Sequence, residues 1–114
     1  MATSANNDGR VFVFGSNLQG AHGAGAAAFA LEHRGAVYGE GIGHHGQSYA
    51  IPTMHGREFL AQHVAIFLDY ARANPQLRFE VTKIGCGIAG FTEAQVAPLF
   101  ADAPTNCDLP EGWY

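Results

Sequence analysis

Two glycine-rich segments carry the clearest chemical signal in this sequence. The first is His22-Gly-Ala-Gly-Ala-Ala27, and the second is Gly85 to Phe91, written GCGIAGF. Residues with small or absent side chains let a phosphate approach backbone N–H groups, and a helix that begins there adds the positive end of its dipole. The segments therefore predict binding of a phosphate-bearing anion without Lys or Arg. The alternative is that each glycine run only allows a helix to pack tightly on a sheet, with no ligand.

Polar side chains beside the first segment are candidates for chemistry. Asn17 follows Gly15-Ser16, and its short amide could contact ribose hydroxyls or close an Asx-turn; spacing alone favours neither interpretation. His22 precedes Gly23, and a histidine can act as a general base or contact a phosphate near neutral pH. The catalytic candidates are Asn17 and His22. The ligand-binding candidates are Gly15, Ser16, Asn17, Gly23, Ala24, Gly25, Ala26, Gly85, Cys86, Gly87, Ile88, Ala89, Gly90 and Phe91.

The remaining histidines give weaker signals. His44, His45 and His55 lie in predicted loops, and their roles stay open. The adjacent pair His44-His45 has no third ligand at a recognisable spacing, so we predict no metal site. His33 and His63 fall on predicted helices, where we expect them to pack or to cap a C-terminus.

The elements around the glycine segments are predicted to bring the two together. Arg10 to Phe14 (RVFVF) predicts a strand before the first segment, and Ala26 to His33 predicts a helix after it. Arg78 to Ile84 predicts a strand before the second segment, and Thr92 with Gln95 predicts a capping box that starts a helix after it. Ligands bind outside the carboxyl ends of the strands in α/β sheets, so both segments are expected to line one cleft.

The other elements are predicted from periodicity and turn residues. The most regular helix is predicted at Arg57 to Ala73, with Leu60, Val64, Phe67, Leu68 and Ala71 facing the core. Four further segments are predicted: a short strand at Ala36 to Tyr38, a loop at Gly39 to Gly46, a strand at Ser48 to Pro52, and an irregular tail from Asn106 to Tyr114 that closes over the core with Trp113.

Composition is typical of a single globular domain. The chain has 114 residues, of which 47% are hydrophobic and 14% charged, so we expect one domain at 10–114 after a flexible lead at 1–9. The net charge of −4 and the scattered basic residues argue against a nucleic-acid groove. With no apolar run of ~18 residues and no signal peptide, the expected location is cytoplasmic, with no membrane partner and with Cys86 and Cys107 as reduced thiols. No cofactor is predicted, and a homodimer stays open.

Four short segments carry a resemblance to a known family. VFGSNLQGAHGAGAA (Val13 to Ala27) and IGCGIAGF (Ile84 to Phe91) resemble the two phosphate loops of macrodomains, the second being nearest to the terminal ADP-ribose protein glycohydrolase branch. SYAIPT (Ser48 to Thr53) resembles the strand that precedes the catalytic lysine in that branch. Together with the final NCDLPEGW, these segments are similar to a group of short bacterial and phage macro-like proteins. The resemblance implies a three-layer α/β/α fold with a mixed central sheet that binds ADP-ribose.

The resemblance also implies roles for particular residues. Asn17 would lie near the distal ribose, Gly23 to Ala26 around one phosphate, Gly85 to Phe91 around the other, and Phe91 near the distal ribose or the adenine end. The glycohydrolase branch carries a Lys and an Asp where this sequence has Met54 and Ala89, neither of which can act as nucleophile or base.

We therefore expect binding of ADP-ribose or a related nucleotide diphosphate metabolite. One alternative is an ADP-ribosyl hydrolase or phosphatase that works through an ordered water and assistance from its substrate. A further alternative is a Rossmann-like nucleotide sensor.

Overall fold

The computed structural model describes residues 8–23 and 25–113. Most of the flexible lead predicted at 1–9 lies outside these ranges. Asp8, which lies inside them, accepts hydrogen bonds from Arg10 at the start of the first strand. None of the helices in the described part of the chain is long and apolar enough to cross a membrane.

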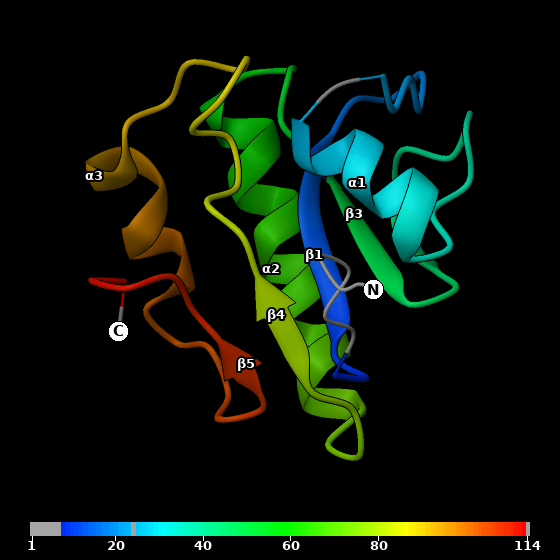
Figure 1. The fold of residues 1–114 in the computed structure, drawn as a ribbon. Coiled ribbons are helices and arrows are strands. Elements are labelled where there is room, and N and C mark those ends of the chain that lie inside the picture. The colour runs from blue at the N-terminus through cyan, green and yellow to red at the C-terminus, as the bar shows by residue number, and fades with distance from the viewer. Residues whose placement is uncertain (1–7, 24, 114) are drawn as a thin grey trace.

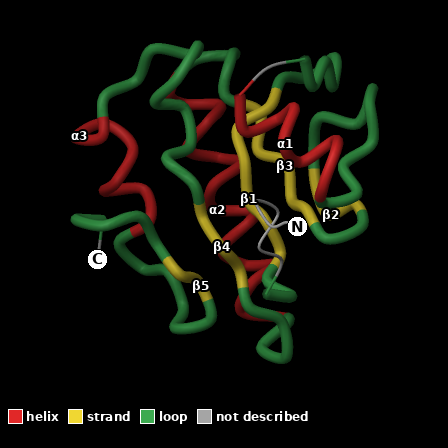
Figure 2. Tube along the Cα trace, in the orientation of Figure 1, coloured by secondary structure: helices red, strands yellow, loops and turns green. Residues whose placement is uncertain are grey.

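The fold is α/β, with a mixed sheet of five strands and three α-helices. The strand order is β2 (Gly43–His45), β3 (Ser48–Pro52), β1 (Val11–Ser16), β4 (Phe79–Val81) and β5 (Cys107–Asp108). β1 pairs in parallel with β3 and with β4, β4 pairs in parallel with β5, and only the β2–β3 pair is antiparallel. Figure 2 shows β1 in the middle of this sheet.

Helices cover both faces of the sheet. Val11 and Val13 of β1 face α2 (Arg57–Ala73), whereas Phe12 and Phe14 face α1 (Gly25–His33). Figure 1 shows α1 in front of the sheet and α2 behind it. A strand covered on both faces needs a continuous apolar run rather than an alternating one, which is why the sequence there reads VFVF.

The order of the strands explains where the helices lie. The chain runs from β1 through α1 and β2 to β3, and then back past β1 through α2 to β4. Because parallel crossovers are right-handed, connections that run in opposite directions across a sheet place their helices on opposite faces. The loop after β1 therefore leads to one face, while the loops after β3 and β4 lead to the other. Their divergence leaves a crevice at the carboxyl ends of these strands.

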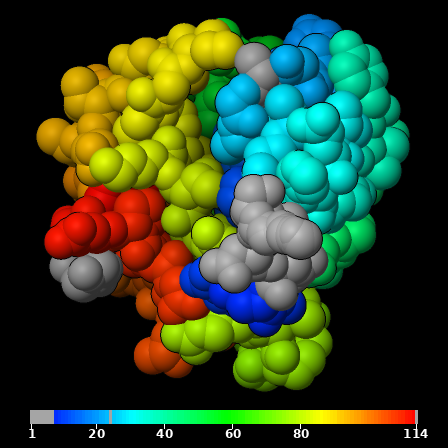
Figure 3. Space-filling view, viewed as in Figure 1, coloured from blue at the N-terminus to red at the C-terminus, as the bar shows by residue number. Residues whose placement is uncertain are grey.

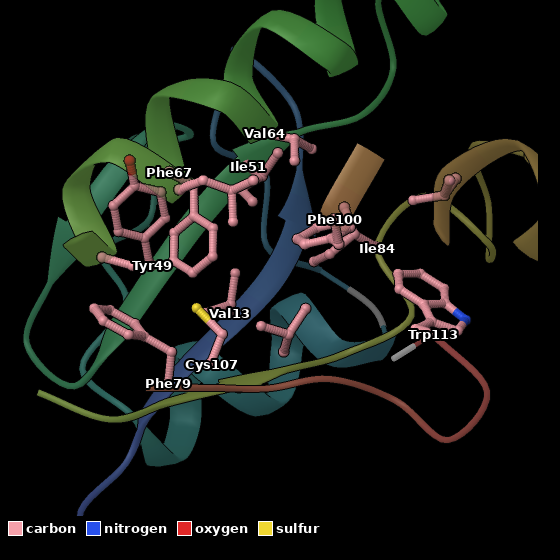
Figure 4. Packing of buried hydrophobic residues seen from close by; sticks show 14 of the residues in the cluster. Val13, Tyr49, Ile51, Val64, Phe67, Phe79, Ile84, Phe100, Cys107 and Trp113 are labelled. Atoms are coloured by element: carbon pink, nitrogen blue, oxygen red, sulfur yellow. The ribbon is translucent and has the colours of Figure 1, made fainter. Parts of the chain in front are cut away.

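The larger core lies between α2 and the sheet. The buried residues of α2 are the five that the sequence predicted, Leu60, Val64, Phe67, Leu68 and Ala71. The Phe67 ring packs edge-on against Tyr49 at 4.9 Å and against Phe79 at 5.2 Å between ring centroids, as Figure 4 shows. A truncation such as Phe67→Ala would cost about 3–5 kcal/mol of stability. This packing fixes β3 and β4 against the same helix.

Two predictions for residues 36–46 need correction. The strand predicted at Ala36 to Tyr38 is wrong, because Val37 and Tyr38 are exposed and the Glu40 N–H closes a turn on the Val37 carbonyl. The loop predicted at Gly39 to Gly46 contains β2, which pairs with β3 through a tight hairpin. Gly46 makes that hairpin possible with a φ of 60°.

Several element boundaries also differ from the sequence prediction. β1 extends to Ser16 because Gly15 and Ser16 still pair with Ile51 and Pro52 of β3. β4 ends at Val81 rather than at Ile84.

The C-terminal region combines a confirmed cap with a missed strand. The capping box of Thr92 and Gln95 is present, but α3 covers only Glu93–Val96 before a 3₁₀ turn, η1 (Ala97–Phe100). The tail predicted as irregular contains β5, and Trp113 is buried against Phe100. Tyr114 lies outside the described residues.

Candidate functional site

A cavity of about 610 Å³ lies at the carboxyl ends of β1, β3 and β4. Its size is in the range of small-molecule sites, roughly 300–1,000 Å³. Both glycine-rich segments line it, and Figure 3 shows the yellow atoms of the second segment and the cyan atoms of α1 on opposite sides of a hollow. The described lining residues are Gly15, Ser16, Asn17, Ala21, Gly23, Gly25, Ala26, Ala27, Thr53, Met54, Thr82, Lys83, Gly85, Cys86, Gly87, Ile88 and Ala89.

Two threonines fix the neighbouring strands to β1 below the cavity. Thr53, directly after β3, donates from its N–H and its hydroxyl to the Ser16 carbonyl, at 2.8 and 3.1 Å. Thr82, directly after β4, donates in the same way to the Val13 carbonyl, at 3.1 and 2.7 Å. Each hydroxyl thereby uses its proton and keeps a lone pair as an acceptor. The two bonded pairs hold the three strand ends in fixed register.

Gly15 lines the cavity at a position where a side chain would be crowded. A Cβ on this residue would lie 3.1 Å from Cγ2 of Thr53 and 3.5 Å from the Gly85 nitrogen. A side chain at Gly15 would therefore crowd Thr53, which follows β3, and Gly85, which begins the second glycine segment.

Asn17 forms a turn and also reaches the cavity. Its carbonyl accepts from the Gly20 N–H at 2.9 Å, and its Oδ1 accepts from the Ala21 N–H at 3.1 Å. The Nδ2 group has no hydrogen-bond acceptor among residues 8–23 and 25–113. The two interpretations of Asn17 are thus compatible, since one end of the amide closes the turn and the other can donate to a ligand.

The first turn of α1 forms one wall of the cavity. Gly25, Ala26 and Ala27 line it, and their backbone N–H groups find no acceptor in the described part of the chain. These N–H groups belong to the start of a nine-residue helix, where the helix dipole is positive. Ala24, a predicted ligand contact, lies outside the described residues.

His22 does not reach the cavity, contrary to its predicted role in substrate contact. Its side chain is 1% exposed, and its ring packs edge-on against Phe14. Nε2 lies 3.1 Å from the Glu40 carbonyl, and Nδ1 lies 3.5 Å from the Ser16 hydroxyl. Both ring nitrogens therefore face protein groups, and His22 anchors the first glycine segment instead of touching a ligand.

The second glycine segment forms the opposite wall. Three backbone hydrogen bonds close it, from Cys86 to Lys83, from Gly90 to Gly87, and from Phe91 to Gly85. The N–H groups of Gly87, Ile88 and Ala89 have no acceptor within the described ranges.

Phe91 and Gly90, predicted ligand contacts, are not among the lining residues. Phe91 instead lies under the segment, where a Cβ on Gly85 would lie 3.1 Å from its Cδ2. Gly85 has a φ of 78°, so a side chain there would be strained as well. The aromatic ring therefore supports the loop from below.

Cys86 lines the cavity but is a poor nucleophile. Burial raises the pKa of its thiol, and the nearby Glu93 carboxylate raises it further. The thiol is therefore protonated at neutral pH, and no base in the described structure hydrogen-bonds to it; its sulfur lies 3.7 Å from the Ile84 carbonyl oxygen. The Cys86 side chain is half-buried.

Sequence reasoning missed several lining residues. They are Ala21, Ala27, Thr53, Thr82 and Lys83. Thr53, Thr82 and Lys83 could have been predicted to line the cavity, because each lies within two residues of the carboxyl end of a strand. A second missed signal is the spacing of Gly85, Gly87 and Gly90, which is Gly-x-Gly-x-x-Gly after a strand.

The remaining histidines have roles in holding the fold. Nε2 of His55 accepts from the Leu18 N–H at 3.3 Å, so it ties the turn after β1 to the loop before α2. His44 bonds to the Tyr70 hydroxyl and to the Gly46 carbonyl. His33 and His63 pack against Phe29 and Phe59, as expected for helix-face residues. Among the described residues, no three His, Cys, Asp or Glu side chains lie close enough to hold a metal ion.

The chemistry of the cavity favours binding. Its described lining contains no Asp, Glu or His, so it presents backbone donors, neutral polar groups and one ammonium group, that of Lys83. Met54 and Ala89, neither of which can act as an acid or a base, both line the cavity. The residues of a fixed acid or base are therefore missing from the described walls.

Comparisons of the chain with family models, with curated proteins and with solved structures return no match.

Proposed function

We propose that the cavity binds ADP-ribose or a related nucleotide diphosphate metabolite, within a three-layer α/β/α fold of macrodomain-like type. The observation that carries this proposal is the presence, on two facing walls, of backbone N–H groups that have no partner among residues 8–23 and 25–113. One set belongs to Gly25, Ala26 and Ala27, and the other to Gly87, Ile88 and Ala89. A diphosphate has two anionic groups, and each wall can donate to one of them.

The rest of the lining suits the other parts of such a ligand. Asn17 Nδ2 can donate to a ribose hydroxyl, and the free lone pairs of the Thr53 and Thr82 hydroxyls can accept from one. Met54 and Ile88 line the cavity and are 48% and 82% exposed, so they offer apolar surface to a ligand. A nucleobase that covers them would remove apolar surface from water.

Binding without turnover is the favoured form of this function. Hydrolysis needs a group that activates water, and the described lining offers neither a carboxylate nor an imidazole. Water-mediated, substrate-assisted hydrolysis is the alternative, and product analysis separates the two.

The test is isothermal titration calorimetry of the purified protein with ADP-ribose, and with AMP, ribose 5-phosphate and NAD as comparison ligands. Chromatography of each mixture afterwards detects products. We expect saturable binding that is tightest for ADP-ribose and no product. Absence of binding to all four ligands would refute the proposal, and product formation would favour the hydrolase.

A further inference from the structure

We propose that Lys83 selects ligands by their negative charge, and that it does so by leaving Glu93 and moving to the ligand phosphate. This inference rests on the proposed function, because it concerns the same cavity. Lys83 is the one charged side chain among the described lining residues. The other donors for an anion in the described lining carry no formal charge, so this ammonium group supplies the formal positive charge for ligand recognition.

The present partner of Lys83 is weak enough to be replaced. Nζ lies 3.1 Å from Oε2 of Glu93, and the two side chains are 56% and 49% exposed. Ion pairs in such exposed positions contribute little, because water screens the charges and holding a long side chain costs entropy. A lysine side chain has a flexible four-carbon stem, so its ammonium can change partners without movement of the backbone.

Glu93, in contrast, is held in place. Its Oε1 accepts from Nε1 of Trp113 at 2.9 Å, and Trp113 is 6% exposed. Glu93 is also the first residue of α3, directly after the capping residue Thr92. The Trp113 hydrogen bond lowers the pKa of the Glu93 carboxyl and the Lys83 hydrogen bond lowers it further, so the group is ionised at neutral pH. Lys83 is therefore the mobile half of the pair.

The position of the pair makes it a competitor of the ligand. Lys83 and Glu93 flank the second glycine segment; Lys83 lines the cavity, and its ammonium is paired with Glu93, which does not line it. A ligand phosphate must draw Lys83 away from Glu93. Loss of Lys83 should weaken binding, whereas loss of the Glu93 charge should strengthen it. A merely structural ion pair would give the same sign for both changes.

Three variants test this competition: Lys83→Met, Glu93→Gln and the double variant. Met keeps much of the apolar stem of Lys83, and Gln keeps an oxygen that can accept from Trp113 Nε1. Calorimetry compares four ligands. ADP-ribose and inorganic pyrophosphate carry two phosphates, AMP carries one, and adenosine carries none. Thermal unfolding of each variant confirms that it is folded.

We expect Lys83→Met to weaken ADP-ribose binding by about tenfold, as for loss of one charge-assisted hydrogen bond. AMP should lose less affinity, and adenosine none. Glu93→Gln should strengthen ADP-ribose binding by roughly threefold, and should do nothing when Lys83 is already Met. Raising the salt concentration should weaken binding less in Lys83→Met than in the parent protein.

The inference is overturned if both single variants weaken binding, if Glu93→Gln has no effect, or if adenosine loses as much affinity as ADP-ribose. The experiment distinguishes failure of this inference from failure of the proposed function. If the parent protein binds pyrophosphate through Lys83 but not ADP-ribose, the nucleotide proposal fails and the inference stands. If the parent binds no phosphate compound, both are refuted.

Discussion

The Cα of Gly41 lies directly against the backbone carbonyl of Asn17, so closely that a Cβ on Gly41 would overlap the carbonyl oxygen. The same approach is repeated nearby, where a Cβ on Gly20 would overlap the backbone of Gly39 and Glu40. The turn that presents Asn17 to the cavity therefore takes its position from residues 39–41. Gly41 therefore allows a close backbone contact between the two segments.

Gly41→Ala should consequently destabilise the protein and distort the site. Overpacking of this kind costs about 1–3 kcal/mol, and a clash with backbone cannot be relieved by rotation of a side chain. Urea denaturation should show a lower midpoint, and calorimetry a weaker affinity for ADP-ribose. Gly23→Ala is the matched control for stability, because a Cβ there meets nothing within 4 Å. Equal stability of the Gly41→Ala variant and the parent would contradict the packing described here.

Asn17→Asp separates the two functions of this amide. The aspartate keeps an oxygen that can accept from the Ala21 N–H, so the turn and the thermal stability should be retained. It loses the Nδ2 donor and places a negative charge beside the anion, so affinity for ADP-ribose should fall by about tenfold or more. Asn17→Ala should lose both stability and affinity. Calorimetry paired with thermal unfolding distinguishes these outcomes, and undiminished affinity in Asn17→Asp would remove Asn17 from the site.

His22→Ala should act on stability. The substitution removes a buried ring and leaves the Glu40 carbonyl without the His22 side chain, while the Ser16 hydroxyl keeps only the Asn17 carbonyl, at a cost of about 1–3 kcal/mol. His33→Ala is the comparison, because that ring is exposed and packs only on Phe29 in the described structure. Urea midpoints should fall clearly for the first variant and little for the second. A His22→Ala variant as stable as the parent would show that the ring is not an anchor.

Regular periodicity made α2 and β3 predictable from the sequence alone. The bounds of both elements, Arg57–Ala73 and Ser48–Pro52, match the prediction. Their apolar residues lie at the spacing of a helix face or in a short buried run, and turn residues end both. These signals are local, and the surrounding chain does not override them.

Other features depend on contacts between distant segments, which a sequence pattern does not reveal. β5 is two residues long and exists only because Phe79 pairs with Cys107. His22 stands at the edge of a glycine loop like an exposed ligand contact, and it is buried because the 39–41 loop folds over it. Lys83 was overlooked because the strand was predicted to continue beyond it. For β5 and His22 the deciding partner is far away in the sequence.

Asp108 should give the stability of the protein an acid-sensitive component. The Arg78 hydrogen bond lowers the pKa of this carboxyl, and Arg10 lowers it further. A depressed pKa means that the carboxylate stabilises the fold above its ordinary pKa of 3.8, and that this contribution is lost as the pH falls below it. Asp108→Asn should lower the melting temperature at pH 7 and make little difference near pH 2. Asp69→Asn, at an exposed pair within α2, is the control, and an equal loss in both variants would argue against a special role for Asp108.

Cys86 offers a direct test of where the ligand binds. Its raised pKa means a smaller thiolate fraction than a free cysteine has at the same pH, so alkylation by iodoacetamide should be slow at pH 7 and should accelerate as the pH rises. Cys107 should react more slowly still, because it is buried and desolvation raises the pKa of its thiol to about 11. Peptide mass spectrometry follows both residues in one sample.

Saturating ADP-ribose should protect Cys86, which lines the cavity, and leave the rate at Cys107 unchanged. Equal protection of both thiols would indicate that the ligand stabilises the whole fold against opening, and would not locate the site. Binding detected by calorimetry without protection of Cys86 would place the ligand away from the second glycine segment.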